Sequence, residues 1–195
     1  MSLDHDATIR RRPMKGLFGR LLARRDGATA IEFAILAIPF FVIIFASLET
    51  FTAFMGEQLL VNATETMARK IRTGEITSST TTEQFRTAFC EEIKILMPCS
   101  SGEVTTPSKL FIDVRNFSSY ASIPKAIPLV DTDLDTTSFA FKPGGRKSIN
   151  IVRAYYRWSV ITDLVRPMIS NIKSKDGSQN YLMIATAVVQ NEDYP

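Results

Sequence analysis

The stretch RRDGATAIEFAILAIPFFVIIF runs from Arg24 to Phe45 and places one carboxylate, Glu32, near the start of a long apolar run. A charged side chain at bilayer depth costs about 2.5–3.5 kcal/mol even on lenient insertion scales. A carboxylate in such a place therefore usually has a partner and a function. Its position is the first indication of what this chain does.

The apolar run is long enough to cross a membrane. It carries no charge between Phe33 and Leu48, and counted from Ala28 it has about 21 residues, close to the 20 or so that a membrane helix needs. Its side chains are apolar on all sides, and Pro39 is tolerated in a membrane helix. We therefore predict a transmembrane helix over 28–48, with a buried core helix as the alternative.

The charges on either side of this run indicate its orientation. Residues 1–27 contain seven basic and three acidic side chains, a net charge of +4, which leaves −1 of the total +3 for residues 28–195. The positive-inside rule predicts a cytoplasmic leader at 1–27 and a periplasmic head domain at 49–195 of a single-pass inner-membrane protein. A cleaved secretory signal would need a shorter run and a small-residue cleavage site. The head lacks the basic surplus that nucleic-acid binding requires.

The helical pattern continues beyond the predicted span. Apolar residues recur every three or four positions and predict an amphipathic helix with one buried face: Leu48, Phe51, Met55, Leu59, Ala63 and Met67. Gly74 follows a basic last turn and is a typical C-terminal cap. As one rod from Ala28 to Thr73 the helix would be about 70 Å long. Two helices with a break near Gly56 are the alternative.

A second, shorter helix is expected after a polar loop. Thr80 and Glu83 have the spacing of a capping box, and Phe85, Phe89, Ile93 and Leu96 mark an apolar face that ends before Pro98. Cys90 and Cys99 are the only cysteines, and both fall in the predicted periplasmic part. Because disulfides form there, we expect a bond between them, with two free thiols as the alternative.

Beyond the second helix the apolar pattern changes to a period of two. Strands are predicted at 109–117, 149–161 and 181–190, and the last is apolar on both faces, which is typical of a central strand. The glycine-containing segment 142–146 is predicted to be a hairpin turn, and residues 118–138 a long connection. The expected fold class is therefore α+β: a long N-terminal transmembrane and amphipathic helix, a second short helix and a small antiparallel sheet.

The head domain offers little for catalysis. His5, the sole histidine, lies in the leader, so histidine-dependent hydrolase and metal sites are excluded from residues 28–195. Asp131, Asp133 and Asp135 alternate as in a calcium loop, but the glycine and the downstream glutamate of such a loop are missing. We interpret them as a solvated acidic loop. We expect no enzymatic activity, no cofactor and no metal site.

The junction of leader and apolar run resembles a known processing site. Gly27, followed by Ala28 and then by Glu32 and Phe33, is similar to the type IV prepilin site, where a membrane-embedded peptidase cuts after the glycine. The resemblance implies cleavage between Gly27 and Ala28. It also implies that Glu32 pairs with the new amine of Ala28, more readily between subunits of a filament, where a low dielectric strengthens the attraction.

Both ends of the chain resemble one family. GATAIEFAILAIPFFVIIFASLETFTAF, from Gly27 to Phe54, is similar to the opening of the TadE-like pseudopilins of the tight-adherence (Tad) pilus. ATAVVQNEDYP, from Ala185 to Pro195, resembles that family's final strand, although there a proline commonly follows the glutamate directly.

The resemblance implies a pilin-like minor pilin or pseudopilin that acts in assembly or secretion of an adhesive Tad-type pilus through subunit contacts. The implied partners are other pilins or pseudopilins, the Tad assembly platform and the prepilin peptidase, with no small-molecule substrate. An uncleaved membrane-anchored periplasmic sensor or ligand-binding domain is the alternative.

Overall fold

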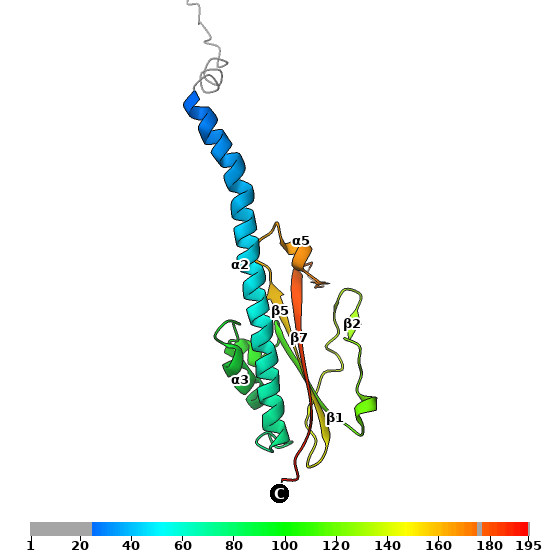
Figure 1. The fold of residues 1–195 in the computed structure, drawn as a ribbon. Coiled ribbons are helices and arrows are strands. Elements are labelled where there is room, and N and C mark those ends of the chain that lie inside the picture. Colours follow the sequence, from blue (N-terminus) through cyan, green and yellow to red (C-terminus); the bar gives the residue numbers. More distant parts are fainter. Residues whose placement is uncertain (1–24, 175–176, 195) are drawn as a thin grey trace, which may run out of the picture. The chain divides into compact units, whose positions relative to one another are not determined.

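The computed structural model describes residues 25–174 and 177–194 (Figure 1). The chain divides into two compact units, residues 1–44 and 45–195. Most of the predicted basic leader, including His5, lies outside the described residues.

Helix α2 runs from Arg25 to Arg72 and passes through Gly56 without a break. The alternative of two helices is therefore wrong. Gly74 follows with φ +80°, a left-handed conformation that glycine adopts without strain. Arg69, Lys70 and Arg72 lie in the last turn, where cations interact favourably with the helix dipole. The predicted C-terminal cap is confirmed.

Two further helices follow α2 before the first strand. Helix α3 spans Thr82–Ile93 and buries Phe85, Phe89 and Ile93 as predicted, and α4 spans Ser101–Thr105. The predicted capping box is shifted by one residue, because it consists of Thr81 and Gln84. The hydroxyl of Thr80 instead accepts a hydrogen bond from the Thr77 N–H in the preceding turn.

Five strands form the main sheet in the order β4-β1-β5-β7-β6. The three long strands are β1 (Leu110–Phe117), β5 (Ile149–Ser159) and β7 (Gln179–Gln190), and they pair antiparallel. The sheet is mostly antiparallel, and the predicted α+β class is confirmed. The central strand is β5, not the last strand, since β7 pairs with β6 (Ile172–Lys173) at only two positions.

The predicted hairpin at residues 142–146 is wrong. Strand β4 (Phe141–Lys142) pairs parallel to β1, on the opposite edge from β5, so the loop after β4 passes the end of β1 to reach β5. The Val114 N–H donates to the Ala140 carbonyl at 2.7 Å and holds β4 on that edge. Pairing with a strand 27 residues earlier leaves no trace in the local turn sequence.

The long connection between β1 and β4 contains structure of its own. It has a short 3-10 helix, η1 (Tyr120–Ser122), and a two-stranded ribbon of β2 (Leu129–Val130) and β3 (Asp133–Leu134). Asp131 takes φ +56° at the ribbon turn, a left-handed conformation that aspartate tolerates better than most residues.

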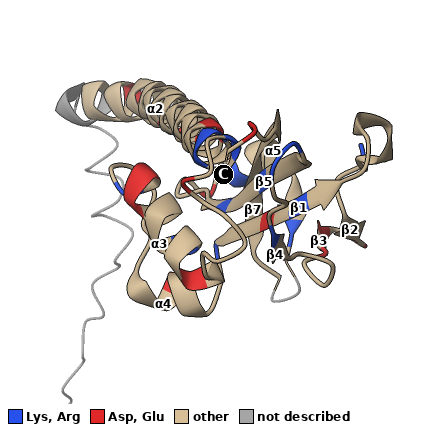
Figure 2. Ribbon diagram, turned by 90° about the horizontal axis from the view of Figure 1, so that it is seen from below, with Lys and Arg blue, Asp and Glu red and all other residues tan. Residues whose placement is uncertain are grey.

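The sheet of the second unit separates two apolar clusters. Residues 45–72 of α2, together with α3 and α4, cover one face, whose buried side chains include Leu60, Met67, Phe89, Val152 and Met183. The β2–β3 ribbon lies against the opposite face, where Leu134, Tyr155, Ile172 and Leu182 are buried together. Figure 2 shows α3 and α4 on one side of the strands and β2 and β3 on the other.

The disulfide joins Cys90 of α3 to Cys99, with the Cα atoms 5.4 Å apart. It connects α3 to the segment before α4. Backbone hydrogen bonds from Leu96 and Met97 to the Ile93 carbonyl turn the chain back after α3 and bring Cys99 within reach.

Two buried charged side chains, Glu103 and Arg86, fix α3 and α4 to the start of β1 through hydrogen bonds to the backbone. The Glu103 carboxylate accepts hydrogen bonds from the N–H groups of Ser108, Lys109 and Leu110 at 2.7–2.8 Å, and from the Ser108 hydroxyl. The Arg86 guanidinium donates to the carbonyls of Val104, Glu103 and Leu110. Burial raises the pKa of Glu103, but the hydrogen bonds from Ser108, Lys109 and Leu110 outweigh burial and hold this pKa below its ordinary value.

We expect Cys90→Ser with Cys99→Ser to lower the free energy of unfolding by about 2–3 kcal/mol, the entropic contribution of a disulfide that closes a short loop. Urea unfolding of the detergent-solubilised full chain measures this loss in two comparisons: the double variant against the oxidised wild type, and the reduced wild type against the oxidised wild type. An unchanged midpoint in both comparisons would show that the bond contributes no stability.

We expect Glu103→Gln to lower the free energy of unfolding at pH 7 by about 1–3 kcal/mol, because it removes the negative charge that strengthens the bonds from the N–H groups of residues 108–110 and the oxygen that accepts the Ser108 hydroxyl. The folded pKa of Glu103 is lowered, so its stabilisation is present above the ordinary glutamate pKa and is lost as the pH falls through the folded pKa. The difference in free energy of unfolding between wild type and Glu103→Gln should therefore be smaller at pH 3 than at pH 7, which urea unfolding at both pH values measures. Exposed Glu65→Gln is the control, and a difference that stays constant with pH contradicts the assignment.

Candidate processing and assembly site

The predicted processing residues lie at the N-terminal end of α2. Gly27 and Ala28 have helical backbone, and the side chains of Glu32 and Phe33 are exposed. Within the described residues, Glu32 makes no hydrogen bond or ion pair. The cut after Gly27 and the amine pairing of Glu32 therefore stay predictions.

The first part of α2 presents an apolar surface. Over the residues that the structure describes, one helix is long and apolar enough to cross a membrane, and none of its most apolar window is buried. Large apolar side chains stay more than half exposed along it: Ile35, Leu36, Ile38, Phe40, Ile43 and Phe45. Exposed apolar surface of this extent indicates contact with lipid or with other proteins.

The buried face of α2 in the second unit differs from the predicted one. Ala63 and Met67 are buried as expected, but Leu48, Phe51 and Met55 are exposed. The residues that face the sheet in these turns are the small Ala53 and Gly56. Periodicity could not find them, because this part of the helix is apolar on its outward face as well.

Small residues are needed here because the helix comes very close to other side chains. A Cβ on Gly56 would lie 3.1 Å from the Trp158 ring, 3.2 Å from Met97 and 3.3 Å from Met183. At the next residue of the helix, Glu57 accepts a hydrogen bond from the Tyr181 hydroxyl at 3.2 Å. Burial and the neighbouring Glu57 both raise the pKa of Tyr181, so its hydroxyl stays protonated.

Glu49 connects α2 to the segment that follows β5. Its buried carboxylate accepts hydrogen bonds from the N–H groups of Ile161 and Thr162, the latter at 2.9 Å. Burial raises the pKa of Glu49, but the bonds from Thr162 and Ile161 and the charge of Arg166 outweigh burial and lower it. The sequence did not indicate this contact. No local signal could have found it, since the donors are backbone groups more than 110 residues away.

The C-terminal Asn-Glu pair has a clear structural role. Asn191 is buried, and its amide nitrogen lies 2.9 Å from the carbonyl oxygens of Gly144 and Gly145. The Glu192 N–H donates to the Arg72 carbonyl at 3.0 Å, and its carboxylate lies 3.4 Å from the Arg72 guanidinium. The pair therefore joins the loop before β5 to the C-terminal end of α2.

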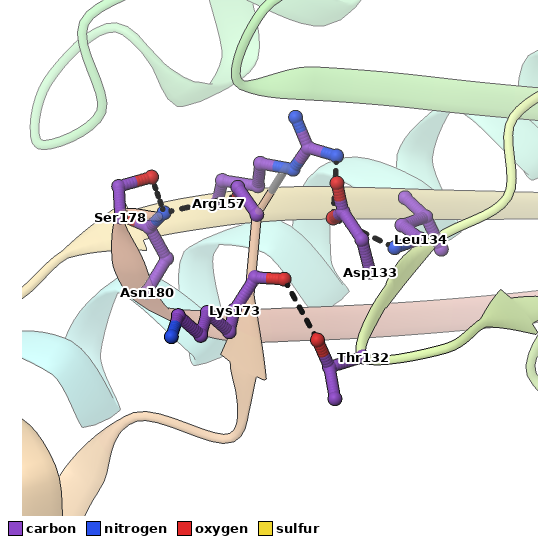
Figure 3. A network of polar contacts seen from close by, with 8 residues as sticks. Thr132, Asp133, Leu134, Arg157, Lys173, Ser178 and Asn180 are labelled. Atoms are coloured by element: carbon purple, nitrogen blue, oxygen red, sulfur yellow. Dashed lines mark hydrogen bonds and ion pairs between the residues drawn. The ribbon is translucent and has the colours of Figure 1, made fainter. Parts of the chain in front are cut away.

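The acidic loop at residues 131–135 was expected to be solvated, but one of its aspartates is buried. Asp133 is buried and pairs with Arg157 of β5 at 2.7 Å (Figure 3). The Arg157 guanidinium also lies 4.8 Å above the Phe111 ring, a cation–π contact. Thr132 and Lys173 exchange two further hydrogen bonds, so these contacts hold the β2–β3 ribbon to the sheet. Within the described part of the chain, no group of three metal-binding side chains comes together.

Comparison with known proteins finds one family similarity, in the first part of the chain. The family model described as TadE-like protein matches residues 27–69, which begin at the predicted processing glycine and end in the last turn of α2. No curated protein and no solved structure matches the chain. Over residues 27–69 the chain matches the TadE-like family, which confirms the resemblance of the segment from Gly27 to Phe54 and suggests a pilin-like protein associated with Tad pili. The resemblance of Ala185–Pro195 to that family's final strand stays a prediction.

Proposed function

We propose that this chain is a minor pilin or pseudopilin of a Tad-type type IV pilus, and that it acts in assembly or secretion of the pilus through subunit contacts. The observation that carries the proposal is the extent of the family match, which begins at Gly27 and follows α2 to Arg69. The proposed organisation is a cytoplasmic leader at 1–27, a membrane span at 28–48 and a periplasmic head at 49–195.

Glu32 has no charged partner among the described residues, and processing after Gly27 would create one. The new α-amine of Ala28 is a cation four residues before Glu32, and residues four apart lie on the same face of a helix. In the apolar surroundings of packed helices, such a pair is attracted far more strongly than in water. A carboxylate inside an apolar run is then useful, because it sets the register between neighbouring subunits.

The outward face of α2 supplies a surface for these contacts. Phe51, Phe54 and Met55 are about half exposed or more, while Ala53 and Gly56 pack against the head. The proposed partners of this face are the corresponding helix faces of other pilins or pseudopilins. The Tad assembly platform and the prepilin peptidase are further proposed partners of the chain. Contacts of this kind need no catalytic group.

If the chain is processed, its mature form begins at Ala28. Intact-mass and N-terminal peptide analysis of the membrane fraction should detect this end in wild-type cells and the full leader in cells without the pilin peptidase. Detection of the full leader alone in wild-type cells contradicts the proposal and favours a tethered sensor or ligand-binding domain.

Loss of the paired charge should block assembly without blocking insertion. We expect Glu32→Ala to reach the membrane at wild-type level and to reduce sheared surface pili at least tenfold, because the Ala28 amine stays unpaired in apolar surroundings. Glu65→Ala, an exposed carboxylate in the same helix, is the matched control. Normal piliation with Glu32→Ala rules out the paired-charge role.

A further inference from the structure

The segment between β5 and β6 exposes three large apolar side chains in the second unit. Ile161 is 84% exposed, Leu164 69% and Met168 83%, the last within the short helix α5 (Arg166–Ile169). No other connection between strands in the described residues exposes apolar side chains to this extent. The described fold does not use these side chains for its own packing.

This segment holds a defined conformation. The Arg166 guanidinium donates to the Val160 carbonyl at 3.0 and 3.1 Å, and the N–H groups of Val165 and Arg166 donate to the Thr162 carbonyl at 3.0 Å. Val160 itself is buried. The exposed side chains therefore project from a hydrogen-bonded turn.

Glu49 sets the level of this turn along α2. Its carboxylate binds the Ile161 and Thr162 N–H groups, and it directly follows Leu48, the last residue of the predicted span. Leu48 and Phe51 are also exposed, and Phe51 lies about 4.5 Å further along the helix at 1.5 Å per residue. The turn therefore lies beside the part of α2 that would leave the membrane.

The charges of the turn favour apolar contact over attraction to anionic headgroups. Asp163 and Arg166 form an ion pair at 2.7 Å, and Arg166 also lowers the pKa of Glu49 through its charge. With Glu49 included, the turn has two acidic groups and one basic group, so it presents no net positive charge to a membrane.

We propose that this turn is a second membrane contact, in which Ile161, Leu164 and Met168 insert into the interfacial layer of the bilayer that α2 spans. Insertion of such side chains is favourable because it removes apolar surface from water. Two contacts, one from α2 and one from the turn, restrain the orientation of the head above the membrane. The inference rests on α2 spanning a bilayer and is independent of cleavage and of pilus assembly.

Tryptophan quenching by brominated lipid tests this contact. Trp158 is the sole tryptophan, and its indole nitrogen is buried without a hydrogen-bond partner among the described residues, so Trp158→Phe gives a suitable background. In that background, full-length Leu164→Trp is reconstituted into phosphatidylcholine vesicles brominated at carbons 6 and 7 of one acyl chain. We expect quenching at least threefold stronger than for Tyr120→Trp.

Tyr120 is a matched control because it is exposed and lies at the other end of the sheet. It follows the Phe117–Ile149 end of the β1–β5 pair, whereas the turn follows Ser159 at the opposite end. Both variants carry the same introduced ring, so its own preference for interfaces is equal in the comparison. Adding Ile161→Ser and Met168→Ser to Leu164→Trp should reduce its quenching.

Three results would overturn the proposal. The first is equal quenching at positions 164 and 120. The second is unchanged quenching after Ile161→Ser and Met168→Ser, which would mean that the introduced ring alone enters the lipid. The third is a blue shift at 164 that grows with protein-to-lipid ratio without quenching, which would assign the turn to contact with a second copy. A prepilin that stays uncleaved would affect none of these measurements.

Discussion

The constraint on which this structure depends is that one helix, α2, must suit two environments. Its first part has apolar side chains on all sides, and its second part must bury one face against a sheet. The change comes at Glu49, the first carboxylate after the apolar run. That carboxylate is buried because backbone N–H groups of Ile161 and Thr162 replace its water. The same contact positions the end of β5 beside the helix.

Polar contacts hold both ends of the buried part of α2. At one end Glu49 binds the segment after β5, and at the other the Arg72 carbonyl accepts the N–H of Glu192, just after β7. Because β5 and β7 pair along their full length, these contacts fix the helix to one rigid pair of strands. Between them the packing depends on small residues, above all Gly56, that allow a close approach.

The close approach also explains why apolar side chains remain on the outward face of α2. The sheet is covered by Ala53, Gly56 and Leu60, so Phe51, Phe54 and Met55 are not needed for the internal core. A helix with two apolar faces, one buried and one exposed, is suited to contact with other helices or with lipid. The exposed face is the one that the proposed function assigns to contacts with other subunits.

The sequence by itself determined the elements that depend on local pattern. An uninterrupted apolar run specifies the helix, alternation specifies β1 and β5, and a short run that is apolar on both faces specifies β7, because these patterns lie in neighbouring residues. The family resemblance also depended on contiguous residues, from Gly27 onward. The Cys90–Cys99 pairing had no competing partners in the sequence.

Only the tertiary structure decided which faces and strands meet. The pairing of β4 with β1, the central place of β5, the contact of Glu49 with Ile161 and the burial of Asp133 against Arg157 all join residues far apart in the chain. Each choice depends on partners that the local sequence does not contain, so the packed fold alone could make it.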